Sequence, residues 1–131
     1  MEDFHYLTAE QRGSLEGLPF SVLLPSTLPQ GFKVLSLERV EMEEGNEAVL
    51  VLGRDKARLR VRNADSGLGD PVGDRVTEHT HADFGRVSVY HEDDGDFASA
   101  WLELEGSWAG ISGHGVDQQA ISELVESLSL Y

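Results

Sequence analysis

Apolar and polar residues alternate with a period of two along much of this chain, which is typical of strands with one buried face. The clearest case is Lys56 to Arg62, where Ala57, Leu59 and Val61 fall on one side of the strand. Further β-rich segments, separated by short turn sequences, cover residues 32–42, 47–52, 84–91, 97–105 and 108–112. Together with a short apolar segment near residue 20, they predict about seven strands.

Three of the four prolines lie between Leu18 and Phe32, around a short apolar segment. Proline fixes φ, lacks a backbone N–H and keeps the residue before it extended. The run therefore predicts a short strand held between rigid corners. A glycine and Phe32 then lead into the main sheet.

Helical patterns stand at the two ends of the chain. Thr8 and Gln11 have the spacing of a capping box, which predicts a helix over residues 9–16 that ends at Gly17. Asp117 is placed to cap a closing helix. The apolar residues of that helix recur at the spacing of one helix face: Ile121, Leu124, Val125 and Leu128.

Strands joined mostly by tight turns predict an antiparallel meander, because parallel neighbours need long crossover connections. With helices that cover one face, the fold class is α+β, built on a single antiparallel sheet of about seven strands. We expect one domain over residues 1–131, with 1–17 as a helical lead-in and 18–128 as the β-rich core plus closing helix. Residues 63–75, rich in Gly and Asp, are expected to form a long loop.

Three segments resemble a bacterial family of small domains of unknown function. They are the run Pro19 to Phe32, the stretch Trp101 to Gly106 followed by Trp108, and the closing helix residues 121–128. The family occurs in sporulation-type lipoproteins and at the C-terminal, sensing end of predicted anti-sigma factors. The resemblance implies a curved half-barrel sheet like that of lipoprotein carriers. It also implies a binding or regulatory role.

The charge balance limits the classes of partner. The chain has 24 acidic and 10 basic residues, a formal net charge of −14, and no cysteine. This charge repels nucleic-acid phosphates and anionic lipids, so we expect neither a nucleic-acid partner nor membrane insertion. The acidic N-terminus lacks the basic start of a signal peptide. We expect a soluble, cytoplasmic protein as written, or an extracytoplasmic one if an upstream signal or anchor has been removed.

Four of the ten basic residues, Lys56, Arg58, Arg60 and Arg62, alternate along one predicted strand. They could form a cationic track that holds a carboxylate, a phosphate or an acidic partner segment. The simpler account is that they are paired across the strands with acids such as Glu38, Glu41 or Glu47, or that they protect an edge strand. The sequence leaves both interpretations open.

Trp101 and Trp108 are the two tryptophans of the chain. The simplest interpretation places them in the core or at its margin. If both were exposed on a concave sheet face, they would be anchors for an apolar or peptide ligand.

A metal site is the third candidate. His79 and His81 have the His-x-His spacing that points two imidazoles to one side of a strand, and Gly73 precedes them as in a cupin motif. The glutamate of that motif is missing, and no second motif follows. His91 could be a further ligand. A divalent metal would suit this set, although we expect no cofactor, and two exposed histidines at a loop end are the simpler account.

We therefore predict a non-enzymatic binding or regulatory module that presents a sheet face to a peptide, a lipid-like ligand or a partner protein. One alternative is a small cupin-like metal enzyme that uses His79, His81 and His91. Another is an acidic domain that associates only with itself as a homo-oligomer.

Overall fold

A computed structural model describes residues 4, 6–18, 20, 22–28, 31–42, 45–65, 75–81, 85–91, 97–104, 107–116 and 118–131. Its helices are α1 (Ala9–Leu15) and α2 (Gln118–Ser127). Its strands are β1 (Leu23–Pro25), β2 (Lys33–Met42), β3 (Gly45–Arg54), β4 (Ala57–Ala64), β5 (Arg75–His81), β6 (Gly85–His91), β7 (Phe97–Leu104), β8 (Ser107–His114) and β9 (Leu128–Leu130).

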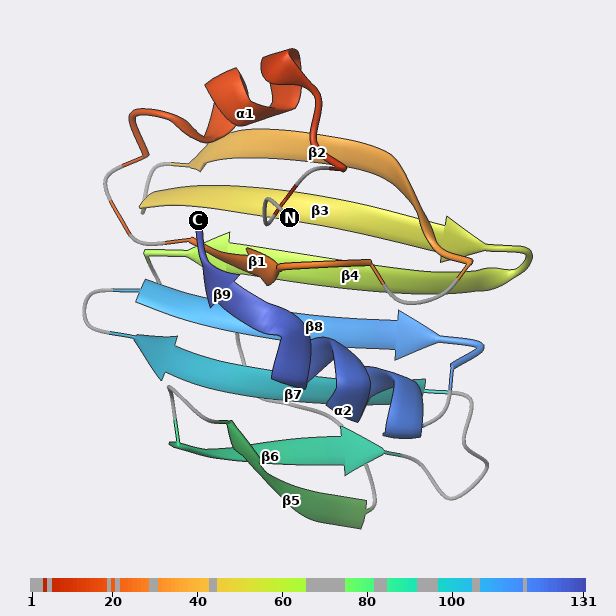
Figure 1. Ribbon diagram of the computed structural model, residues 1–131. Helices are drawn as coiled ribbons and strands as arrows, with labels where there is room; N and C mark the ends of the chain where they lie inside the picture. Colours follow the sequence, from red (N-terminus) through yellow and green to blue (C-terminus); the bar gives the residue numbers. More distant parts are fainter. Residues whose placement is uncertain are drawn as a thin grey trace.

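Seven of the strands form one antiparallel sheet in the order β2-β3-β4-β8-β7-β6-β5 (Figure 1). The sheet consists of two meanders, β2 to β4 and β5 to β8, which meet where β4 pairs with β8. The chain therefore leaves β4 in the middle of the sheet and returns at its far edge with β5. This architecture confirms the predicted α+β class, with a seven-stranded antiparallel sheet and a helix near each end of the chain.

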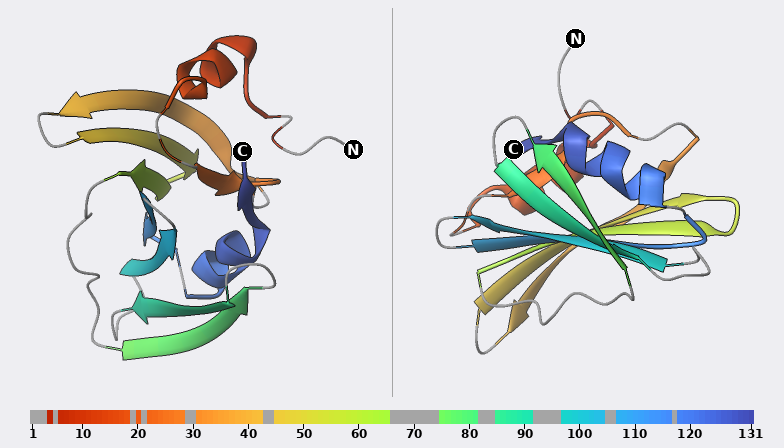
Figure 2. Two further views of the ribbon diagram at one scale, coloured as in Figure 1. Left: turned by 90° about the vertical axis from the view of Figure 1, so that its left-hand side faces the viewer. Right: turned by 90° about the horizontal axis from the view of Figure 1, so that it is seen from below.

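The opening strand does not join this sheet. β1 pairs with β9 instead, with Leu23 opposite Leu130 and Pro25 opposite Leu128. The buried Asn63 side chain attaches this pair to β4, because its Oδ1 accepts from the Leu23 N–H and its Nδ2 donates to the Leu23 carbonyl, each at 2.8 Å. Figure 2 (left) shows the sheet curving around the β1–β9 pair and α2.

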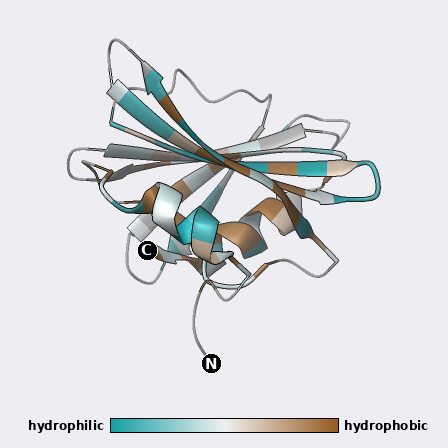
Figure 3. Cartoon of the chain, turned by 90° about the horizontal axis from the view of Figure 1, so that it is seen from above, coloured by the Kyte–Doolittle hydropathy of each residue, from teal (hydrophilic) through white to brown (hydrophobic). Residues whose placement is uncertain are grey.

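The hydrophobic core lies between the sheet and α2. Ile121, Leu124 and Val125 of α2 are fully buried, which confirms the apolar face that the sequence predicts. They belong to the same cluster as Leu59 and other inward residues of the sheet. Apolar and polar segments alternate along the strands in Figure 3. Leu128 is also buried but begins β9, and the predicted cap Asp117 lies outside the described residues.

The first helix begins as predicted. Thr8 accepts from the Gln11 backbone N–H at 3.1 Å and the Gln11 side chain accepts from the Thr8 N–H at 2.9 Å, which completes the capping box. Gly17, beyond the C-cap, has a φ of 81°, a value that glycine adopts without a steric penalty. In the described part of the chain, neither helix has the length and apolar character needed to cross a bilayer.

Two strands have no counterpart among the segments assigned from the sequence. β5 lies in a mostly polar stretch between the predicted loop and the strand expected from residue 84, and β9 is three residues long. The predicted loop is shorter at its start, because Asn63 and Ala64 extend β4. Residues 66–74 of that loop lie outside the described part.

The partly buried hydroxyl of Tyr6 is expected to make the fold sensitive to alkaline pH. It donates to the Pro25 carbonyl at 2.6 Å, and burial raises the pKa of Tyr6 above its ordinary value of 10.0. A raised pKa means that the folded state holds the proton more tightly than the unfolded state. This contribution is therefore fully present below about pH 10 and is lost as the pH rises above it.

We expect the wild-type protein to lose thermal stability as the pH is raised past about 10, and Tyr6→Phe to lose less of it over the same range. The measurement is the melting temperature across that range. Tyr90→Phe is the control for the loss of a hydroxyl, and it should keep the wild-type alkaline loss because Tyr6 remains. An unchanged alkaline slope in Tyr6→Phe would show that Tyr6 does not cause it.

Candidate functional site: a basic hollow on the outer face

The basic side chains of β4 lie on the side of the sheet that faces away from α2, which we call the outer face. Leu59 and Val61 are fully buried toward α2, whereas Arg58 and Arg60 are exposed and Arg62 is half-buried. Successive side chains of a strand point to opposite faces, so the alternating sequence of β4 produces this division. The predicted row of arginines is therefore placed as expected.

Lys56, by contrast, does not belong to this row. It precedes β4, in the turn that connects β3 to β4, and its side chain is exposed. Asp55 in the same turn has a φ of 52°, which is uncommon for a residue other than glycine. The basic row on the strand itself consists of Arg58, Arg60 and Arg62.

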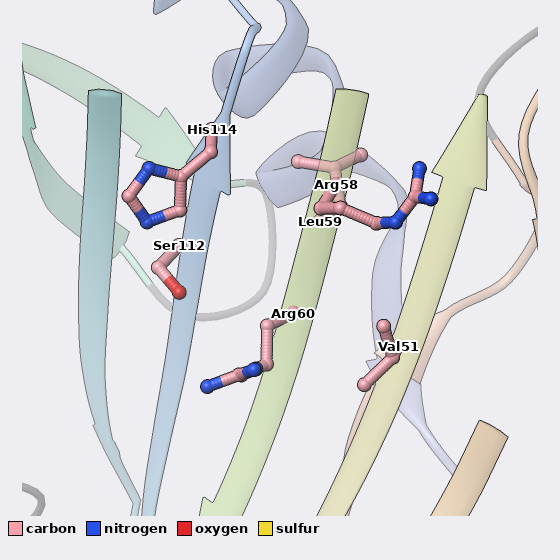
Figure 4. A pocket seen from close by; sticks show the side chains of 6 residues that line it. All are labelled: Val51, Arg58, Leu59, Arg60, Ser112 and His114. Carbon is pink, nitrogen blue, oxygen red and sulfur yellow. The ribbon is translucent and has the colours of Figure 1, made fainter. Parts of the chain in front are cut away.

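A hollow of about 310 Å³ opens on the outer face over β3, β4 and β8. None of the residues that line it is acidic, and all of its polar side chains can donate hydrogen bonds. Figure 4 shows the lining residues, which are Val51, Arg58, Leu59, Arg60, Ser112 and His114. The register explains the grouping, because Arg60 stands opposite both Val51 and Ser112, and Arg58 stands opposite His114.

The three arginines differ in their partners. The Arg58 Nη1 donates to the carbonyls of Asp55 at 2.9 Å and Ala57 at 2.7 Å. The Arg62 Nε donates to the Glu47 carboxylate, so the charge of Arg62 is compensated. Within the described residues, Arg60 has neither a hydrogen bond nor an ion pair, and Arg58 has no carboxylate partner.

Cross-strand pairing with acids therefore accounts for only part of the basic row. Of the acids that the sequence suggested as partners, Glu47 pairs with Arg62, whereas the Glu41 carboxylate lies 3.7 Å from Arg39 on its own strand. Glu38 makes no ion pair in the described part of the chain. Two guanidinium charges of the row thus have no carboxylate partner in the described part of a chain that carries 24 acidic residues.

Both tryptophans lie on the same outer face. Trp101 stands opposite Gly110, which in turn stands opposite Arg62, and Trp108 stands opposite Ala64. Both rings are half-buried. The concave face that the sequence analysis considered for them is filled by α2, so any contact that they make with a ligand is on the outer face.

The three histidines of the metal hypothesis each contact a different residue. His79 Nε2 lies 3.1 Å from Glu126 Oε1 of α2, at an angle that does not make a hydrogen bond. His81 is buried, and its Nε2 lies 3.0 Å from the Leu128 carbonyl oxygen. His91 Nε2 lies 3.1 Å from the Thr77 hydroxyl.

The contacts of His79 and His81 are structural. His79 connects edge strand β5 to the end of α2, and His81 connects it to the start of β9. His81 is not an exposed loop residue but a buried one, because it lies on β5 on the side that packs against the start of β9. Among the described residues, no group of three or more His, Asp or Glu side chains is placed to hold a metal ion.

Sequence reasoning did not find Ser112 and His114. Both lie on β8, which the sequence predicts only as far as residue 112 and without a neighbour. The alternation of β8 places residues 110, 112 and 114 on one face, but their position beside the arginines depends on the pairing of β4 with β8. No local sequence pattern predicts the pairing of β4 with β8.

Comparisons with known proteins give little further information. No family model matches the chain, and no curated protein matches it. A solved structure similar to it is that of MucB in complex with MucA(peri), with a TM-score of 0.47 and 19% sequence identity over 82% of this chain. The chain spans 36% of that MucB chain, which is bound there to another protein. A likeness at this level establishes neither a family nor a partner, so the resemblance to the sensing domains stays a prediction.

Proposed function

We propose that this chain is a non-enzymatic binding module whose outer face captures an acidic segment of a partner protein. The observation that supports the proposal is the hollow on that face. It holds Arg58 and Arg60, which have no carboxylate partner among the described residues, although the chain carries a net charge of −14. The planar guanidinium of arginine matches the geometry of a carboxylate, so Arg58 and Arg60 can each bind a carboxylate of a partner.

The overall negative charge does not prevent such binding, because salt limits its reach. At physiological ionic strength the screening length is about 8 Å, so exposed acids farther from the hollow than this contribute little. Arg58 and Arg60 line the hollow and no acidic residue does, and Glu47 on the neighbouring strand is already compensated by Arg62. The same net charge favours a short acidic segment over a densely charged nucleic acid.

The outer face also offers aromatic area for a peptide. Trp101 and Trp108 are half-buried there, on β7 and β8 beside the hollow. Half-exposed tryptophans are common anchors of protein interfaces because one side chain contributes a large apolar contact. Charge at the hollow and apolar contact at the tryptophans together suit a protein segment better than a small ion.

We expect a short labelled peptide rich in Glu and Asp to bind the wild-type protein in a fluorescence anisotropy titration, more tightly at low salt. The double variant Arg58→Glu/Arg60→Glu should weaken this binding by about tenfold or more, because each reversal replaces an attractive charge by a repulsive one.

Arg39→Glu is the control, since it makes one such charge reversal on β2, outside the residues that line the hollow, and breaks only the exposed contact with Glu41. It should leave peptide binding within about twofold of wild type. Binding that survives the double reversal, or no binding at low salt, would overturn the proposal. A concentration-dependent rise in mass that the double reversal abolishes would identify a second copy of this chain as the occupant instead.

A further inference from the structure

The two halves of the hollow are not equivalent. Figure 4 shows the guanidinium of Arg58 turned toward β3 and that of Arg60 turned toward β8, where Ser112 and His114 lie. Two carbonyls already hold the Arg58 Nη1. The β8 half is therefore the one where a guanidinium without a bonding partner among the described residues lies beside other donors.

Arg60 and Ser112 are direct partners in the register of β4 and β8. Side chains opposite each other in an antiparallel pair have their Cβ atoms about 5 Å apart. In the described part of the chain, neither side chain makes a hydrogen bond. A charged fork and a hydroxyl thus stand side by side in a hollow whose lining residues include no carboxylate.

This set of donors suits a tetrahedral oxyanion better than a carboxylate. A carboxylate has two oxygens in one plane, and a single arginine fork can engage both of them. A phosphate monoester has three free oxygens and a charge of about −1.5 to −2 at neutral pH. Arg60 can bind two of these oxygens while the Ser112 hydroxyl donates to the third.

The size of the hollow is compatible with a phosphate monoester. Its volume of about 310 Å³ is at the lower limit for pockets that enclose small molecules, about 300 to 1,000 Å³. The hollow therefore suits a single head group that projects from a longer molecule. Arg58, whose guanidinium is turned toward β3, remains available to a neighbouring acidic residue of the same segment.

We propose, on the basis of the proposed function, that the β8 half of the hollow receives a phosphorylated side chain of the partner protein, bound by Arg60 and Ser112. The bound group is thus a phosphate monoester, and the flanking acidic residues contact Arg58. The interaction is non-covalent, and no bond is formed or broken.

The test compares three peptides that differ only at their central residue, which is phosphoserine, glutamate or serine. We expect the phosphoserine peptide to bind about tenfold more tightly than the glutamate peptide. Ser112→Ala should remove most of this preference and leave the glutamate peptide unaffected. Ser36→Ala on β2 is the matched control, since Ser36 does not line the hollow, and it should keep the preference.

The outcomes separate the two proposals. Equal binding of the phosphoserine and glutamate peptides, with both lost in Arg60→Glu, would overturn the phosphate inference and leave the acidic-segment proposal in place. No binding of either peptide would overturn both. If inorganic phosphate alone competes at the same concentration as the phosphoserine peptide, the ligand is free phosphate and the inference of a protein source is wrong.

Discussion

Asn63→Ala is expected to lower the free energy of unfolding by about 2 to 6 kcal/mol, because it leaves two buried backbone groups of Leu23 without partners at about 1 to 3 kcal/mol each. Asn63 and Leu23 are both fully buried, and the two hydrogen bonds between them are each 2.8 Å long. Whole domains are stable by only about 5 to 15 kcal/mol. The variant should therefore be partly unfolded or close to it.

Urea denaturation followed by tryptophan fluorescence and circular dichroism measures this loss. Asn46→Ala on the adjacent strand β3 is the matched control, because the contact at Asn46 is made by its backbone N–H with Asp65. We expect the control to change the unfolding free energy by less than about 0.5 kcal/mol. A similar small change in Asn63→Ala would show that the β1–β9 pair does not depend on this side chain.

Gly113→Ala is expected to destabilise the protein by about 1 to 3 kcal/mol through overpacking. Gly113 lies on β8 directly beneath α2. A Cβ at this position would collide with Val116 and would come within 2.9 Å of Leu59 Cδ2 and 3.1 Å of Ile121 Cδ1. These neighbours are buried core side chains, so they have little room to move aside.

Gly13→Ala is the control, because it makes the same substitution where space is open. Gly13 lies in α1, and a Cβ there would meet nothing within 4 Å. Alanine is favoured over glycine in a helix by about 1 kcal/mol, so this variant should be more stable than wild type. Thermal denaturation of both variants is the measurement, and opposite signs are the expected result. A neutral Gly113→Ala would mean that α2 is not held as closely to β8 as the structure indicates.

Local patterns predicted those parts of the fold that depend on neighbours in sequence. The capping box of Thr8 and Gln11 is formed as expected. The alternation in β4 correctly separates buried Leu59 and Val61 from the arginines between them. Periodicity works here because the direction of a side chain follows from the geometry of one strand or one helix turn.

Pairing between distant strands could not be predicted in the same way. Nothing in the sequence around Leu23 indicates that it pairs with Leu130 rather than joining the main sheet. Likewise, the return of the chain to the far edge at β5 follows from the packing of the whole sheet. Such pairings are decided by the burial of the complete core, in which residues far apart in sequence contribute together.

The candidate site shows the same division. The sequence alone determined that basic residues alternate along one strand of an acidic chain, and period-two geometry was sufficient to place Arg58, Arg60 and Arg62 on one face. Only the tertiary structure decided which of these charges are compensated and which face a hollow. It did so because strand order selects the neighbours across the sheet: β3 supplies Glu47 to Arg62, and β8 supplies Ser112 to Arg60.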